Sequence, residues 1–89
     1  MKLIKKVQVK NRMGLHTRPA TAIVKILRNV KSSVTFTYKK QTVNAKSILS
    51  LLMLAARFNT TITLCIEGED AQQTMECLVN AFENHFGEQ

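Results

Sequence analysis

Acidic residues are absent from the first two thirds of this 89-residue chain. All 6 aspartates and glutamates lie at or after Glu67, whereas all 13 lysines and arginines lie at or before Arg57. The formal net charge is +7. The basic part of the chain therefore produces a positive field that favours an anionic ligand, an acidic protein surface or nucleic acid. A solvated basic surface without a ligand would have the same composition.

Long hydrophobic runs are absent as well. The longest apolar stretch, from Ile48 to Ala56, is interrupted by Ser50 and is far shorter than a membrane span. The basic start of the chain is not followed by the apolar segment of a signal peptide. These absences predict a cytoplasmic protein that does not enter a membrane.

Cysteine is scarce, with only Cys65 and Cys77 in the chain. Strand alternation places Cys65 on the face opposite Leu64, and Cys77 stands beside Leu78 on an expected helix. This pattern resembles neither a disulfide framework nor a metal site. We therefore expect two partly buried free thiols in a reducing compartment, and neither a metal nor a cofactor.

The length predicts a single domain over residues 1–89, without linker, repeat or low-complexity segment. Alternating apolar residues predict strands over Lys2 to Val9, Val34 to Tyr38 and Thr60 to Glu67, with a short return strand that begins at Thr42. Lys39 and Lys40 form the expected turn of the central hairpin, and Asn59 supplies a left-handed turn residue.

Three segments have helical signals. The first contains the buried stripe of Ala20, Ile23, Val24 and Leu27, with Pro19 in its first turn. Ser47 is the expected N-cap of a second helix that runs to about Leu54, and Asp70 that of a third with Met75, Leu78 and Phe82 on one face. The order βαββαβα predicts an α+β fold, with an antiparallel or mixed sheet covered by helices on one face.

His16 is the strongest candidate functional residue, because it stands at the start of the first expected helix. Free N–H groups and the positive end of the helix dipole bind phosphate at such positions and disfavour a charged imidazole. His16 would then be a neutral nucleophile, and Arg18 could contact an attached phosphoryl group. Thr17, Pro19 and Ala20 support the helix start. An ordinary surface histidine remains the alternative, and His85 is interpreted as a structural or surface residue.

The second helix is apolar almost all round. Leu51 and Leu54 are expected core residues, which leaves Ile48, Leu49 and Leu52 as an exposed docking patch, and Met53 fits either face. A core helix with imperfect patterning is the alternative. Ser47 has a complete explanation as an N-cap, but a phosphate there would also place negative charge beside the patch.

Two segments together resemble HPr, the histidine-containing phosphocarrier family of the phosphoenolpyruvate-dependent phosphotransferase system. They are Gly14-Leu15-His16-Thr17-Arg18-Pro19-Ala20 and Thr42-Val43-Asn44-Ala45-Lys46-Ser47-Ile48. The resemblance covers essentially the whole chain. The chain departs from it at Ser50 and Ala55, where many relatives carry glycine, and at the Phe58-Asn59 turn.

The resemblance implies an open-faced β-sandwich with a four-stranded antiparallel sheet and three helices. It implies that enzyme I phosphorylates His16 on Nδ1 with phosphate from phosphoenolpyruvate, assisted by Arg18. The phosphoryl group would pass to an enzyme II A-domain in sugar uptake, or to a regulatory A-type protein. Ser47 would be the target of an HPr kinase/phosphorylase, and the exposed patch would be the shared docking surface. We expect the protein to be a monomer.

Two alternatives follow from the same residues. The Leu51-Leu52-Met53-Leu54 run and the Asn11-Arg12 lead-in also resemble the nitrogen-related branch, which regulates and does not move sugar. A basic nucleic-acid-binding module would fit the charge. However, the strand aromatics Phe36 and Tyr38 share the expected core face with Val34 and would not be available for base stacking. We therefore expect no nucleic-acid partner.

Overall fold

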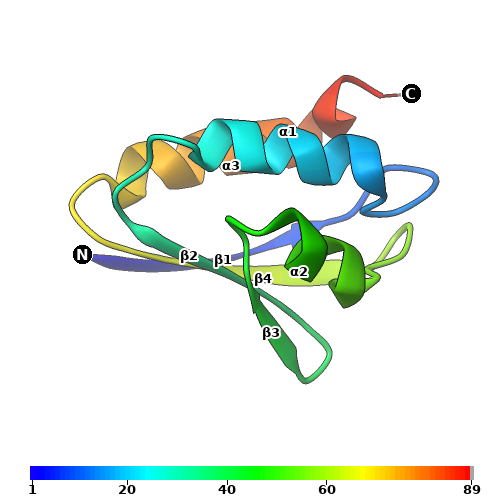
Figure 1. Ribbon diagram of the computed structural model, residues 1–89, viewed down its shortest axis with the longest axis horizontal. Helices are drawn as coiled ribbons and strands as arrows, with labels where there is room; N and C mark the ends of the chain where they lie inside the picture. The colour runs from blue at the N-terminus through cyan, green and yellow to red at the C-terminus, as the bar shows by residue number, and fades with distance from the viewer. Residues whose placement is uncertain (89) are drawn as a thin grey trace.

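The computed structural model describes residues 1–88. Four strands and three helices follow one another along the chain in the expected order βαββαβα (Figure 1). They are β1 (Lys2–Gln8), α1 (Thr17–Leu27), β2 (Ser33–Tyr38), β3 (Gln41–Asn44), α2 (Ile48–Leu54), β4 (Thr61–Glu67) and α3 (Ala71–Glu83), followed by the 3₁₀ turn η1 (His85–Gly87). Within residues 1–88 no helix is long and apolar enough to cross a membrane.

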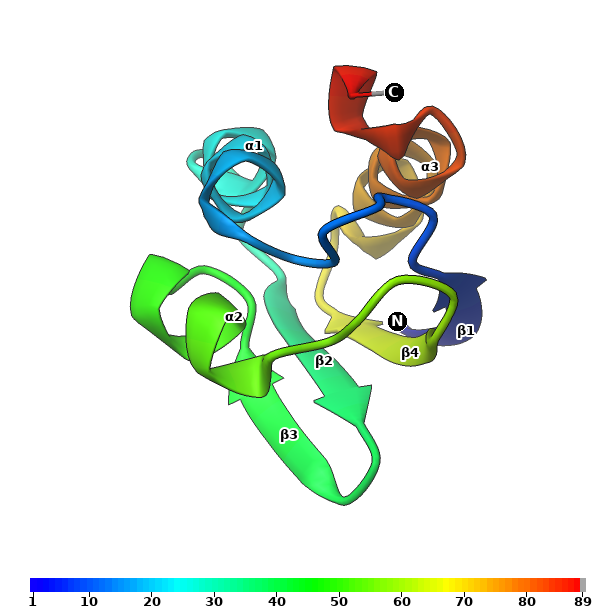
Figure 2. The ribbon, with the colours of Figure 1, turned by 90° about the vertical axis from the view of Figure 1, so that its right-hand side faces the viewer.

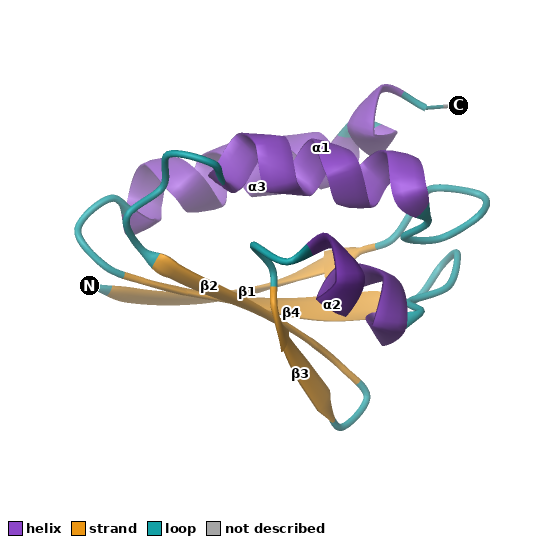
Figure 3. Cartoon of the chain, viewed as in Figure 1, coloured by secondary structure: helices purple, strands orange, loops and turns teal. Residues whose placement is uncertain are grey.

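The strands form one sheet in the order β1-β4-β2-β3, and every pairing is antiparallel. Of the two sheet types that the sequence left open, the antiparallel one is therefore correct. The helices lie on one side of the sheet (Figure 3). Figure 2 shows α1 and α3 side by side above the sheet, with α2 below α1 and next to β3. The predicted open-faced sandwich is confirmed.

Alternation in the two central strands divides the sheet into a core face and an open face. Val34 and Phe36 of β2, like the apolar residues of β4, point toward the helices, and Phe36 packs 5.8 Å from Phe82 of α3 between ring centroids. The open face of these strands carries Thr35, Thr37 and other small polar side chains. Phe36 is thus unavailable for base stacking, which argues against the nucleic-acid alternative.

The expected exposed face of α2 is partly wrong. Leu51 and Leu54 are buried as predicted, but Leu52 is half-buried and packs against the core, whereas Met53 is 64% exposed. Six of the seven residues of α2 are apolar, so the sequence has no polar–apolar periodicity. It therefore could not show which side of the helix faces the core. The exposed apolar patch consists of Ile48, Leu49 and Met53, which we call the α2 patch.

Asp70 stands at the N-cap position of α3 but does not cap the helix with its side chain. Its carboxylate accepts hydrogen bonds from the backbone N–H groups of Lys31 (2.8 Å) and Ser32 (2.9 Å), and one from the Ser32 hydroxyl. Its backbone (φ −102°, ψ 25°) lies outside the extended region typical of capping residues. The Ser32 hydroxyl and the two N–H groups lower the pKa of Asp70 to about 2, and the carboxylate holds the start of β2 against the start of α3.

Left-handed backbone occurs at the expected Asn59 (φ 71°) and also at Ala55 (φ 54°), which ends α2. Ala55 therefore keeps the backbone that a glycine would favour at this place, at a small conformational cost. Both cysteines are free, and Cys65 is half-buried as predicted. Cys77 is exposed, contrary to the prediction, because it faces away from the core-facing stripe of α3 that contains Leu78.

Candidate functional site

His16 is the N-cap residue of α1. Its backbone is extended (φ −85°, ψ −164°), and its carbonyl accepts the N–H of Ala20 at 3.1 Å. Thr17 and Arg18 occupy the first two helical positions, where N–H groups have no acceptor within the helix. Pro19 follows at the third position and is buried, and its missing N–H leaves no donor unsatisfied there. His16 thus stands at the start of α1, as the sequence predicted, and is followed in the chain by two backbone donors at the positive end of the helix.

Gly14 allows the loop before His16 to lie against the segment that follows α2. The N–H of Leu15 donates to the Ala56 carbonyl at 3.0 Å. Gly14 has φ +68°, and a Cβ there would come within 2.3 Å of the same carbonyl oxygen. Only glycine combines this backbone with this close approach without strain. The loop and the end of α2 are therefore held together.

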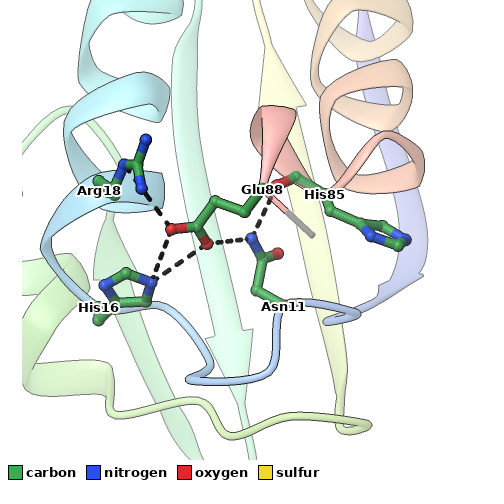
Figure 4. Close-up of polar contacts among 5 residues, drawn as sticks. All are labelled: Asn11, His16, Arg18, His85 and Glu88. Carbon is green, nitrogen blue, oxygen red and sulfur yellow. Dashed lines mark hydrogen bonds and ion pairs between the residues drawn. The ribbon is translucent and has the colours of Figure 1, made fainter.

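Glu88, which lies 72 positions after His16 in the sequence, contacts the His16 ring (Figure 4). The Nε2 atom of His16 lies 3.1 Å from Oε1 and 3.0 Å from Oε2 of the carboxylate. The Nε atom of Arg18 lies 4.0 Å from the same Oε2. The other ring nitrogen of His16 points away from Glu88 in Figure 4. The imidazole therefore has one nitrogen engaged by a carboxylate and one directed elsewhere.

Asn11 holds Glu88 in this place. Asn11 is fully buried, and its Nδ2 donates to Glu88 Oε1 at 2.6 Å and to the backbone carbonyl of His85 at 2.8 Å. The bond from Asn11, followed by the contacts with His16 and Arg18, lowers the pKa of Glu88, although partial burial opposes the shift. The carboxylate is thus held in its ionised form. His85 contributes its backbone to this arrangement, consistent with the structural role expected for it.

Exposure differs among the site residues. The Arg18 side chain is 81% exposed, whereas those of His16 and Glu88 are 29% and 14% exposed. An open groove beside His16 is lined by Arg12, Arg57 and Phe58 among others. The ring lines this groove together with Arg12 and Arg57, and Arg18 lines a second hollow that also contains His16. An anion that approaches His16 would meet a positive surface.

Sequence patterns did not indicate Asn11, Glu88, Arg12 or Arg57 as site residues. Asn11 lies in a predicted loop, and 77 positions separate it from Glu88. No local spacing connects residues so far apart, and Glu88 follows the last predicted helix without a motif around it. Within residues 1–88, no group of three or more His, Cys, Asp and Glu residues could hold a metal ion.

Ser47 occupies the N-cap of α2 as predicted, and its hydroxyl accepts the N–H of Ser50 at 3.2 Å. The residue is half-buried and is followed directly by the α2 patch. The segment after α2 lies beside the loop before His16, because Leu15 bonds to Ala56, whereas Lys46, the residue before Ser47, bonds to the Val30 carbonyl beyond the far end of α1.

Comparison with known proteins agrees with this arrangement. Residues 3–84 match the family described as "PTS HPr component phosphorylation site". The phosphocarrier protein HPr of Chlamydia muridarum is 44% identical over 80 residues, which cover 90% of this chain and 77% of that protein. HPr of Xylella fastidiosa is 40% identical over 80 residues, 90% of each chain. The crystal structure of HPr from Thermoanaerobacter tengcongensis superposes with a TM-score of 0.93 at 31% identity and covers 98% of both chains. The chain therefore belongs to the HPr family of phosphocarrier proteins, as its two motifs indicated.

Proposed function

We propose that this protein accepts a phosphoryl group from enzyme I on His16 and passes it to an enzyme II A-domain in sugar uptake. The observation that carries the proposal is the position of His16 at the N-terminus of α1, directly before Thr17 and Arg18, whose N–H groups have no acceptor within the helix. The phosphoryl oxygens would accept these two bonds. The protein is a covalently modified carrier in the cytoplasm and needs no metal or cofactor.

The chemistry requires stabilisation of a charged group without tight binding. The helix end and the guanidinium of Arg18 would stabilise the negative charge that develops during transfer. The exposed Arg18 side chain can move from Glu88, 4.0 Å away, to the phosphoryl oxygens. Because the groove beside the ring is open, two different proteins can reach His16 in turn.

The α2 patch is the proposed docking surface. Ile48, Leu49 and Met53 are exposed by 38%, 67% and 64%, and they lie on the helix that packs against α1. Such apolar patches mark sites of protein interaction. Compared with the sequence-based patch, Met53 takes the place of Leu52. The arginines around His16 would form the polar rim of this surface.

Ser47 is the proposed site of regulatory phosphorylation by an HPr kinase/phosphorylase. A phosphate on its hydroxyl would stand at the N-cap of α2, directly before Ile48. The negative charge would disfavour an apolar or acidic partner at the α2 patch. A regulatory relay without sugar transport is the alternative to sugar uptake, and only the acceptor differs. Transfer tests with a sugar-specific A-domain and with a regulatory A-type protein separate the two.

Intact-mass measurement after incubation with enzyme I and phosphoenolpyruvate tests the proposal. We expect one added phosphoryl group that is lost in acid, and none in His16→Ala. His85→Asn is the matched control, because asparagine tolerates the left-handed backbone of position 85 (φ 54°). If His16→Ala is phosphorylated as fully as the parent chain, the carrier assignment is wrong.

A further inference from the structure

We propose that Glu88 is a positioning residue for His16, whose carboxylate keeps the ring proton on Nε2 and so leaves the lone pair on Nδ1. The proposal rests on the proposed function, in which Nδ1 receives the phosphoryl group. It adds a residue from the C-terminal turn, outside both sequence motifs, to the phosphorylation site.

The first argument is the geometry at Nε2. Both carboxylate oxygens of Glu88 lie within hydrogen-bond distance of this atom, at 3.1 and 3.0 Å. An ionised carboxylate can only accept hydrogen bonds, so Nε2 must be the donor. In the neutral ring, the proton on Nε2 leaves Nδ1 unprotonated. Figure 4 shows Nδ1 on the side of the ring turned away from Glu88.

The second argument is that the carboxylate is itself held in place. Asn11 is fully buried and donates to Glu88 at 2.6 Å and to the His85 carbonyl at 2.8 Å. The same side chain therefore fixes both the turn η1 and the carboxylate that follows it. Phe86 of this turn packs edge-on against Phe82 of α3, with 4.8 Å between ring centroids. Glu88 is thus anchored from the core and from the loop before His16.

The third argument is the charge balance of transfer. The lone pair of Nδ1 forms the new bond to phosphorus, while the bond between phosphorus and the donor atom of enzyme I breaks and its electron pair stays on the donor. The proton remains on Nε2, so positive charge develops on the ring beside the carboxylate. A carboxylate in this position stabilises the developing imidazolium, as in other histidine–carboxylate pairs. Transfer to the acceptor reverses these steps.

The test uses the full chain with Glu88→Ala, which removes the acceptor, and Glu88→Gln, which keeps an acceptor but removes the charge. Glu83→Gln is the matched control, because Glu83 is an exposed glutamate at the end of α3. The first readout is the ¹⁵N chemical shifts of the His16 ring nitrogens in the unphosphorylated protein, at a pH above the range in which histidine titrates. The second is the initial phosphorylation rate with enzyme I and phosphoenolpyruvate.

We expect the Nε2–H tautomer alone in the parent and a mixture of tautomers in Glu88→Ala. The phosphorylation rate should fall about tenfold in Glu88→Ala and by less in Glu88→Gln, since one partly exposed charge-assisted hydrogen bond is lost. Glu83→Gln should change neither readout. An unchanged tautomer, an unchanged rate or faster phosphorylation in Glu88→Ala would each overturn the proposal. If the parent chain itself accepts no phosphate, the proposed function fails, and the tautomer measurement remains informative about Glu88.

Discussion

Replacing Gly14 by alanine should damage both the stability of the protein and the phosphorylation site. Gly14 has φ +68°, and an added Cβ would lie 2.3 Å from the Ala56 carbonyl oxygen and 3.1 Å from the Cα of Arg57. Both neighbours are backbone atoms, so no side chain can rotate to make room. The Ala56 carbonyl also accepts the N–H of Leu15, the residue before His16.

The expected cost combines three effects. Left-handed backbone costs a residue with a Cβ roughly 1–2 kcal/mol. Overpacking against a well-packed neighbour costs about 1–3 kcal/mol. The smaller conformational entropy of unfolded alanine returns about 0.4–1 kcal/mol. The free energy of unfolding should therefore fall by about 1–5 kcal/mol, with a central value of about 3 kcal/mol, which for a chain of this size lowers Tm by roughly 12–24 °C.

Urea unfolding followed by circular dichroism measures this loss, and Gly87→Ala is the matched control. Gly87 also has a positive φ (+79°), but a Cβ there would meet nothing within 4 Å. It should therefore lose about 1 kcal/mol or less. Equal losses in the two variants would refute the argument from close approach. The folded fraction of Gly14→Ala should also be phosphorylated more slowly, because His16 follows the displaced loop.

Three further predictions concern charge. Asp70 has its pKa lowered from 3.8 to about 2, so its contribution to stability is complete above pH 3.8 and is lost as the pH falls toward 2. Asp70→Asn should flatten this part of the stability curve measured by urea unfolding. Arg18→Ala should slow phosphoryl transfer about tenfold without preventing it, whereas Arg28→Ala, at the far end of α1, should not; equal rates in both would contradict a role for Arg18. Ser47→Asp should raise the KM for enzyme I about fivefold at unchanged kcat, and unchanged kinetics would argue against docking at the α2 patch.

The strands, the first helix and the core could be predicted because local periodicity in the sequence indicates them. Alternation in β2 and β4 and the helical spacing of Ala20, Ile23 and Leu27 led to the correct strands, helix and core. The histidine motif is contiguous, so the sequence alone was enough to locate it at a helix start. All of these features can be recognised from residues that lie close together in the sequence.

The missed features depend on contacts between distant residues. Asn11 and Glu88 meet only because the turn after α3 folds back over the loop before α1. The carboxylate of Asp70 accepts from the N–H of Ser32, which lies 38 positions earlier and directly before β2, instead of capping its own helix. Packing against α1 and β3 determines which side of α2 is buried. A nearly uniform apolar sequence does not contain this information. The predicted exposure of Leu52 was therefore wrong, and the sequence could not place Met53 on either face.

The most direct test of the carrier function is the return of the phosphoryl group. The phosphorylated chain is purified, freed of phosphoenolpyruvate, and mixed with unphosphorylated enzyme I while intact masses of both proteins are followed. The account predicts that His16 loses its phosphoryl group as enzyme I gains one, while the phosphorylated chain alone remains modified over the same time. Phosphate that stays on the chain, or that appears only as free inorganic phosphate, would contradict a reversible carrier.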